Sequence, residues 1–141
     1  MRFISTRIHG IIDYFLGIAL IAAPWLFNFV ANGSETWIPV TLGVVLIVYS
    51  LFTDYEYGLV NNISVKTHLW LDSLLGIFLA SSPWLFNFNL QVYQPHLWVG
   101  VLLTVVAIFT LTSSKKTGAY GGIKITKEEK TTREAEPIER M

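Results

Sequence analysis

The chain has 141 residues, of which 52% are hydrophobic and only 14% are charged, and its mean hydropathy is +0.51. An average soluble domain carries about 25% charged residues, so this composition disfavours a soluble globular protein. Ten basic and ten acidic residues leave no net charge, and we therefore expect no nucleic-acid partner. Cysteine is absent, which excludes disulfides, thiolate metal sites and cysteine nucleophiles.

The charged residues gather at the carboxyl end of the chain. Residues 8–112 contain one basic residue and five acidic ones, whereas residues 113–141 contain seven Lys or Arg and five Glu. Without that tail the remainder is an apolar body that water could not easily accommodate. We therefore expect a transmembrane domain over residues 1–112, with the lipid bilayer as its partner, and a charged, flexible cytoplasmic tail over residues 113–141.

Four apolar segments predict an all-α membrane protein. They lie near residues 9–29, 38–55, 68–88 and 96–112, and each approaches the roughly 20 helical residues that cross a bilayer. The first segment follows Arg2 and Arg7, as the apolar run of a signal peptide would. However, Asp13 interrupts it, and the same segment recurs inside the chain. We therefore expect a retained first helix and a four-helix bundle.

The positions of Lys and Arg predict the orientation. The connections at residues 30–37 and 89–95 contain neither residue type. All ten basic residues, which include Lys66, Lys115 and Lys116, fall on the other side. Because basic residues accumulate in cytoplasmic loops, both termini and the middle loop are expected to be cytoplasmic.

The first apolar segment is repeated 59 residues later. Residues 9–29 and 68–88 align without a gap and share 12 identities in 21 positions. Each unit is a hairpin of two spans, with repeat 1 over about residues 8–58 and repeat 2 over about residues 67–112. Two spans return the chain to its starting side, so both hairpins have one orientation and a pseudo-two-fold axis along the membrane normal is expected. The identical pairs are His9/His68, Asp13/Asp72, Leu16/Leu75, Gly17/Gly76, Ile18/Ile77, Leu20/Leu79, Pro24/Pro83, Trp25/Trp84, Leu26/Leu85, Phe27/Phe86, Asn28/Asn87 and Phe29/Phe88.

The arrangement His-x3-Asp-x3-Gly followed by Ser-Pro-Trp, in two tandem two-helix units, resembles the SPW repeat family of small bacterial membrane proteins. The resemblance covers roughly residues 8–112. The second copy carries Ser82, Pro83 and Trp84, whereas the first copy has Ala23 in place of the serine. A serine that one copy lacks is a poor candidate for a nucleophile. The resemblance implies a multi-pass fold in a bacterial inner membrane and no established reaction.

The repeated Pro-Trp pair predicts the outer membrane boundary. A proline cannot donate to the carbonyl four residues earlier, here that of Leu20 or Leu79, so we expect the last helical turn to kink or unwind. Ser82 or Asn87 could satisfy the freed carbonyl in the second copy, and Asn28 could do so in the first. The tryptophans suit an interfacial belt, and an outward-facing aromatic ligand pocket is the alternative. The residues of this boundary motif are Pro24, Trp25, Asn28, Ser82, Pro83, Trp84 and Asn87.

Two His–Asp pairs, His9/Asp13 and His68/Asp72, are the most informative polar residues of the spans. A spacing of four residues places each pair on one helix face, near the cytoplasmic edge. The structural interpretation is a polar staple that hydrogen-bonds the first helix to the third. Ionisable residues inside a membrane are often functional. Three alternatives therefore stay open, namely a proton or cation relay, a divalent metal site and a haem held by the two histidines.

One glycine lies near the middle of each predicted helix, where it permits close helix packing. These glycines are Gly17, Gly43, Gly76 and Gly100, and the second and fourth align when the second outer loop is two residues shorter than the first. The remaining histidine, His96, follows Pro95 at an outer helix start and is expected to face solvent.

No phosphate-binding glycine loop, His-Glu-x-x-His motif or dense set of carboxylates identifies a catalytic residue, so we expect no enzyme and assign no cofactor and no metal ligand. The leading hypothesis is a structural, accessory or scaffold protein of the membrane. It would form a homo-oligomer or join a larger membrane complex through its glycine-bearing faces. The first alternative is an oligomeric channel or transporter for protons or small ions that uses the His/Asp pairs. The second alternative is a haem- or metal-binding membrane protein.

Overall fold

A computed structural model describes residues 3–112 of the chain. Arg2, Lys115, Lys116 and the expected cytoplasmic tail lie outside the described residues. Within the described range the chain forms four helices, and an all-α architecture is thereby confirmed. The helices are α1 (Thr6–Leu26), α2 (Ser34–Leu51), α3 (Val65–Leu85) and α4 (Gln94–Phe109).

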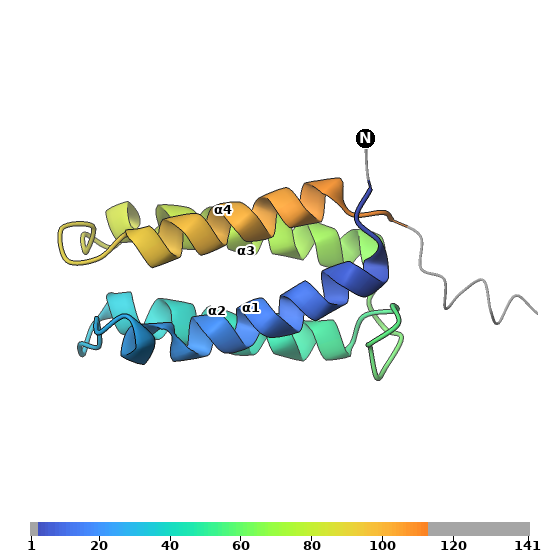
Figure 1. The fold of residues 1–141 in the computed structure, drawn as a ribbon, viewed down its shortest axis with the longest axis horizontal. Helices are drawn as coiled ribbons and strands as arrows, with labels where there is room; N and C mark the ends of the chain where they lie inside the picture. Colours follow the sequence, from blue (N-terminus) through green and yellow to red (C-terminus); the bar gives the residue numbers. More distant parts are fainter. Residues whose placement is uncertain (1–2, 113–141) are drawn as a thin grey trace, which may run out of the picture.

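The helices form two hairpins that lie side by side, as Figure 1 shows. The most extensive helix contacts are within each hairpin, between α1 and α2 and between α3 and α4. Residues 27–33 and 86–93 connect the paired helices at one end of the bundle, which we call the hairpin-loop end. The start of α1, the α2–α3 connection and the end of α4 lie at the opposite, N-terminal end (Figure 1). This layout brings residues far apart in the sequence together at the N-terminal end.

The first helix of each hairpin begins with the same cap. The Ser5 and Ser64 hydroxyls accept hydrogen bonds from the backbone N–H groups of Ile8 and Thr67, at 3.3 and 3.2 Å. A serine in this position satisfies one of the free N–H groups of the first turn. These two helices therefore begin three residues before the predicted starts at residues 9 and 68. The predicted boundaries were late because an apolar run marks the embedded part of a helix and not its polar cap.

The repeated Pro-Trp-Leu-Phe-Asn-Phe stretch forms the end of α1 and of α3. Both helices continue for two residues past the proline, so of the two expected outcomes, a kink or unwinding of the last turn, unwinding at the proline does not occur. Asn28 has a φ of 53°, a left-handed conformation that asparagine tolerates better than most residues. The Phe29 N–H then donates to the Pro24 carbonyl at 3.0 Å, which is the closing bond of a Schellman motif. The second copy repeats this geometry, with a φ of 58° at Asn87.

Glycines allow the two helices of each hairpin to approach closely. A Cβ atom on Gly43 would lie 2.6 Å from the Gly17 carbonyl oxygen, and one on Gly100 would lie 2.4 Å from that of Gly76. Carbon and oxygen atoms do not pack at such distances, so any larger residue would push the backbones apart. All four glycines are buried between paired helices. Contrary to expectation, their faces are therefore not available to another chain.

The interior between the hairpins is closely filled by large side chains. One buried cluster contains Leu16 of α1, Leu46 and Tyr49 of α2, and Leu103 of α4. Leu46 and Leu103 have no exposed surface, and neither does Leu79 of α3. The core therefore draws residues from both hairpins.

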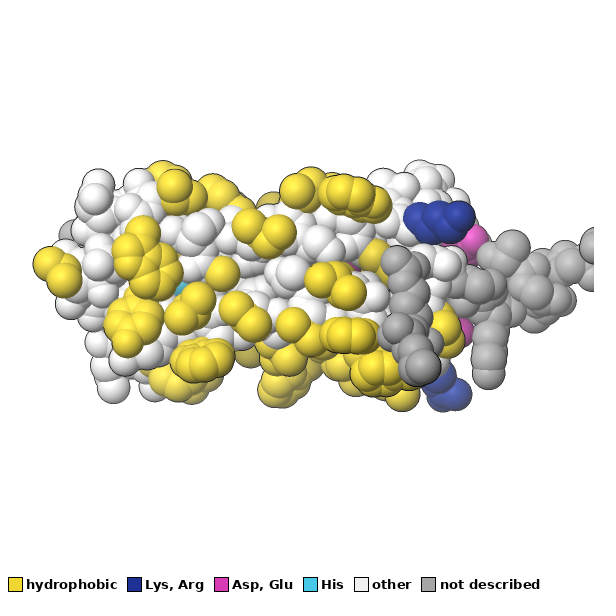
Figure 2. Space-filling view, turned by 90° about the horizontal axis from the view of Figure 1, so that it is seen from above, with side chains coloured by type: hydrophobic (Ala, Val, Ile, Leu, Met, Phe, Trp, Pro, Cys, Tyr) yellow, Lys and Arg dark blue, Asp and Glu magenta, His cyan; other side chains and the backbone are white. Residues whose placement is uncertain are grey.

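The outer surface is apolar over much of its length. Figure 2 shows hydrophobic side chains along one face, with Lys and Arg side chains gathered towards one end. Phe15, Ile18 and Trp70 are more than 60% exposed. By length and composition α1 and α2 could each cross a membrane, whereas α4 is apolar but has only 16 residues. The fourth helix begins two residues before the predicted span of residues 96–112 and ends three residues before the end of that span. The third, α3, carries Lys66 and Asp72.

Candidate functional site: a buried histidine–aspartate cluster

The two His–Asp pairs meet in one cluster inside the N-terminal end of the bundle. His9 Nε2 lies 2.9 Å from Asp72 Oδ2, and His68 Nε2 lies 3.0 Å from Asp13 Oδ2. Each histidine also lies 3.2 Å from the aspartate of its own helix. All four residues are at most 2% exposed. We call this set of four residues the His–Asp cluster.

The cluster forms because each helix supplies a His and an Asp one turn apart. A spacing of four residues stacks the two side chains on one helix face. In α1 and α3 this face points into the bundle, where the two helices lie opposite one another. The shorter contact of each histidine is to the aspartate of the other hairpin, so the polar bonds run between the repeats.

Two threonines complete the surroundings of the histidines. Thr53, just after α2, lies 2.7 Å from His68 Nδ1, and Thr110, just after α4, lies 3.0 Å from His9 Nδ1. Each threonine thus contacts the histidine of the other hairpin. The sequence analysis did not select them. Their separation of 57 residues equals that of Gly43 and Gly100, so extending the second-helix alignment to its end would have found them.

The threonines also fix the tautomer of the histidines. Thr53 Oγ1 lies 2.8 Å from the Tyr49 carbonyl, and Thr110 Oγ1 lies 2.6 Å from the Val106 carbonyl. A carbonyl only accepts, so the single proton of each hydroxyl is donated to it. The hydroxyl oxygen must then accept from the histidine, which places a proton on Nδ1 of both rings. Both Nε2 atoms consequently face the carboxylates.

The cluster is not fully symmetric. The Tyr49 hydroxyl donates to Asp72 Oδ1. The position that corresponds to Tyr49 in the second hairpin, 57 residues later, is Val106, which has no hydroxyl. Asp13 Oδ1 is buried and has no hydrogen-bond partner among the described residues. This carboxylate oxygen of the cluster can therefore still accept a hydrogen bond.

Tyr55 covers the cluster at the N-terminal end. Its ring centroid lies 5.5 Å from that of His68, and its side chain occupies the space where a Cβ atom of Gly10 would lie. The residue is 2% exposed, and its burial raises the pKa of the phenol. The Tyr55 ring therefore covers His68 on this side.

His96 lies at the hairpin-loop end, far from the cluster in sequence and in the fold. It is 1% exposed, so the expectation that it faces solvent is wrong. Its Nε2 atom is 3.1 Å from the Glu35 carbonyl, and its ring packs against Phe29 and Phe88. The two phenylalanines are the last residues of the two copies of the Pro-Trp-Leu-Phe-Asn-Phe stretch. They fold over the start of α4 and shield the histidine from water.

The boundary motif does not form an enclosed aromatic pocket around its tryptophans. Trp25 and Trp84 are 55% and 50% exposed. Trp84 lines an open apolar groove of about 430 Å³ on the α3–α4 surface. Ser82 is buried, and its hydroxyl donates to the Leu79 carbonyl at 2.8 Å, one of the two donors considered for this carbonyl from the sequence. The serine is thus occupied by a backbone bond.

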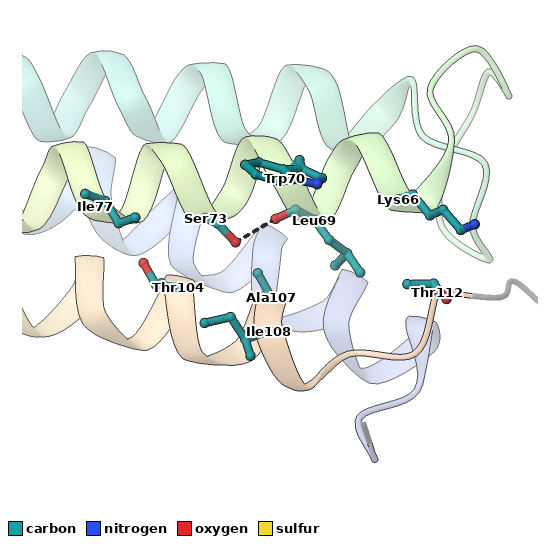
Figure 3. Close-up of a pocket in the computed structure, with 9 residues that line it drawn as sticks. All are labelled: Lys66, Leu69, Trp70, Ser73, Ile77, Thr104, Ala107, Ile108 and Thr112. Atoms are coloured by element: carbon teal, nitrogen blue, oxygen red, sulfur yellow. Dashed lines mark hydrogen bonds between the residues drawn. The ribbon is translucent and has the colours of Figure 1, made fainter. Parts of the chain in front are cut away.

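A second surface groove, of about 650 Å³, lies between α3 and α4 nearer the N-terminal end (Figure 3). Trp70 and Ile77 line it from α3, and Thr104 and Ile108 line it from α4 (Figure 3). The hydroxyls of Ser73 and Thr104 donate to carbonyls of their own helices, those of Leu69 and Gly100. None of the four cluster residues lines either groove. The cluster is therefore an interior site without a ligand-sized opening in these two grooves.

The His–Asp cluster can bridge the two hairpins, share protons or hold a cation. A family model described as the SPW repeat domain matches residues 7–112. Comparison with curated proteins and with solved structures gave no match. The family match and the long apolar helices indicate a small membrane protein. The resemblance seen in the sequence is confirmed, and the chain belongs to the SPW repeat family.

Proposed function

We propose that this protein is a structural or accessory component of a bacterial inner membrane, in which the His–Asp cluster fastens two transmembrane hairpins into one rigid unit. The observation that carries the proposal is the reciprocal pairing of His9 with Asp72 and of His68 with Asp13, at 2.9 and 3.0 Å. Polar bonds between helices are a recognised means of holding membrane bundles together.

The surface chemistry supports four membrane-spanning helices. Large apolar side chains are exposed around the middle of all four, including Phe15 on α1, Val44 on α2, Ile77 on α3 and Leu102 on α4. In water such a surface would aggregate, whereas lipid tails solvate it. The 16 residues of α4 extend about 24 Å. A modest local thinning of the bilayer accommodates a span of this length.

The charges support cytoplasmic termini. Arg7 and Lys66 are the basic residues of the described range, and both lie near the N-terminal end of the bundle. The connections at the hairpin-loop end contain no Lys or Arg. With parallel hairpins, the expected pseudo-two-fold axis runs along the bundle. The paired caps at Ser5 and Ser64 and the paired threonines are consistent with such an axis.

The filled interior favours a structural role over a transport path within one copy. Leu46, Leu79 and Leu103 fill the middle of the bundle, and none of their side chains has any exposed surface. The side-chain hydroxyls of Thr53, Thr110 and Tyr49 are committed to bonds within the chain. With the glycine faces buried, we assign association with other membrane proteins or further copies to the exposed apolar helix faces.

Single-cysteine variants test the topology, because the native chain contains no cysteine. Asn32→Cys and Leu90→Cys lie at the hairpin-loop end, and Asn61→Cys lies in the α2–α3 connection. In intact spheroplasts a membrane-impermeant maleimide should label the first two variants and should label Asn61→Cys only after lysis. Labelling of all three in intact cells would contradict four spans.

Ion flux in proteoliposomes tests the structural role. Native protein should give no proton or ion flux above that of empty vesicles. The matched control carries Asp13→Asn with Asp72→Asn. Flux through the native protein that disappears in this control would replace the structural role with a relay role for the cluster.

A further inference from the structure

We propose that the His–Asp cluster is a binding site for one divalent cation of the Zn²⁺ type. The ligands are Nε2 of His9, Nε2 of His68 and one carboxylate oxygen each from Asp13 and Asp72. The inference rests on the proposed role of the cluster in fastening the hairpins, and it identifies a bound cation as what holds them together.

The four donor atoms have the right chemistry and spacing. They all lie within 4.8 Å of one another, and the four nitrogen–oxygen distances run from 2.9 to 3.2 Å. Tetrahedral Zn²⁺ with bonds of 2.0–2.1 Å separates neighbouring ligand atoms by about 3.3 Å. The four nitrogen–oxygen distances are thus within about 0.4 Å of the tetrahedral value, whereas donor atoms that are up to 4.8 Å apart would have to approach each other by up to about 1.5 Å when a cation binds.

The surroundings aim the histidines as metal ligands. Because Nδ1 of each ring donates to Thr53 or Thr110, the neutral imidazole presents its Nε2 lone pair to the centre. Metal-bound histidines commonly have their other nitrogen fixed by such a hydrogen bond. The Tyr49 hydroxyl similarly fixes Asp72 through its second oxygen. Asp13 Oδ1, which has no hydrogen-bond partner within residues 3–112, can join or adjust the coordination of its carboxylate.

The charge of the cluster is compatible with a divalent cation. Two neutral imidazoles and two carboxylates carry two negative charges in a buried space, which either two added protons or one divalent ion would neutralise. Two protons can occupy only two of the four nitrogen–oxygen contacts. A proton on each Nε2 would be directed at one carboxylate, and the other two contacts would be longer, secondary contacts of 3.2 Å. A central ion interacts favourably with all four ligand atoms at once, and the near equality of the four distances matches that arrangement.

The ligand set selects the class of cation. Mg²⁺ and Ca²⁺ prefer six or more oxygen ligands, whereas two nitrogens and two oxygens in a compact four-coordinate set suit Zn²⁺. A haem does not fit, because Asp13 and Asp72 occupy the space between the two histidines. Four protein ligands in a sealed interior describe a structural site with no open position for a substrate.

The test uses the untagged full-length chain in detergent micelles, since a histidine tag would itself bind the metal. After treatment with EDTA and removal of the chelator, Zn²⁺ or Co²⁺ is added, and bound metal and melting temperature are measured. We expect about one ion per chain, a higher melting temperature, and the visible absorption of tetrahedral Co²⁺.

His9→Gln and His96→Gln form a matched pair, because each removes a buried histidine but only the first removes a ligand. His9→Gln should lose stoichiometric binding, and His96→Gln should keep it. Should His9→Gln fail to fold, Thr110→Val and Thr110→Ser serve instead. Thr110→Val, which removes the hydroxyl, should weaken Zn²⁺ affinity about 10- to 100-fold, and Thr110→Ser, which keeps a hydroxyl, should restore the native affinity.

Two outcomes overturn the cation proposal, and they separate it from the proposed function. In the first outcome, native protein binds no more Zn²⁺ or Co²⁺ than His9→Gln does, while cluster variants still lower the melting temperature in EDTA. Protons then hold the hairpins together, and only the cation proposal fails. If the cluster variants change neither metal binding nor melting temperature, both proposals fail.

Discussion

Replacing His68 with alanine should be the most damaging single change within the bundle. His68 is 1% exposed and lies within 3.2 Å of polar atoms on three partners, namely Asp13, Asp72 and Thr53. Its removal leaves two carboxylates facing each other with only His9 between them. Each of these partners then lacks a bond that water cannot replace in the sealed interior.

Two independent estimates give a similar magnitude for His68→Ala. Removing one member of a buried ion pair costs about 3–5 kcal/mol. Polar contacts between membrane helices contribute about 0.6–1.7 kcal/mol each, so the loss of three amounts to about 2–5 kcal/mol. We therefore expect a loss of about 3–4 kcal/mol in the free energy of unfolding, measured by SDS titration in mixed micelles that contain EDTA.

His96→Ala is the matched control for this measurement. His96 is equally buried, but its polar contact with another residue is a single bond to the Glu35 carbonyl. The control should therefore lose its ring packing and one hydrogen bond of about 1 kcal/mol. A loss for His68→Ala no larger than that for His96→Ala would refute the idea that the cluster fastens the hairpins.

Two further substitutions test how the hairpins are built. Gly100→Ala should cost about 1–3 kcal/mol or more, because its Cβ would lie 2.4 Å from the Gly76 carbonyl oxygen and 2.6 Å from the Ala80 nitrogen. Thermal melting followed by circular dichroism would measure this loss, and a melting temperature equal to that of the native protein would contradict the close approach. Asn87→Ala should cost about 1 kcal/mol, since alanine is strained at a φ of 58°, whereas Asn87→Gly should be tolerated. Equal melting temperatures for these two variants would show that the left-handed turn does not matter.

The sequence predicted the hairpins well because their signals are local. Apolar runs, the 59-residue repeat and the glycines depend on residues close together in the chain. The helix boundaries were displaced, since Ser5 and Ser64 cap the helices outside the apolar runs. The asparagines of the boundary motif were considered as side-chain donors, whereas their backbone conformation is what closes each helix.

The family, the number of helices and the four residues of the His–Asp cluster could all be read from the amino-acid sequence, because residue identity and spacing carry that information. How these residues are paired depends on the packing of the two hairpins. A spacing of four residues makes Asp13 an obvious partner for His9, yet the shorter contact is to Asp72 of the other hairpin. Packing between the hairpins also brought Thr53 and Thr110 onto the histidines and left Asp13 Oδ1 without a donor in the described part of the chain. The chemistry of the cluster depends on these contacts, which exist only once the two repeats have packed together.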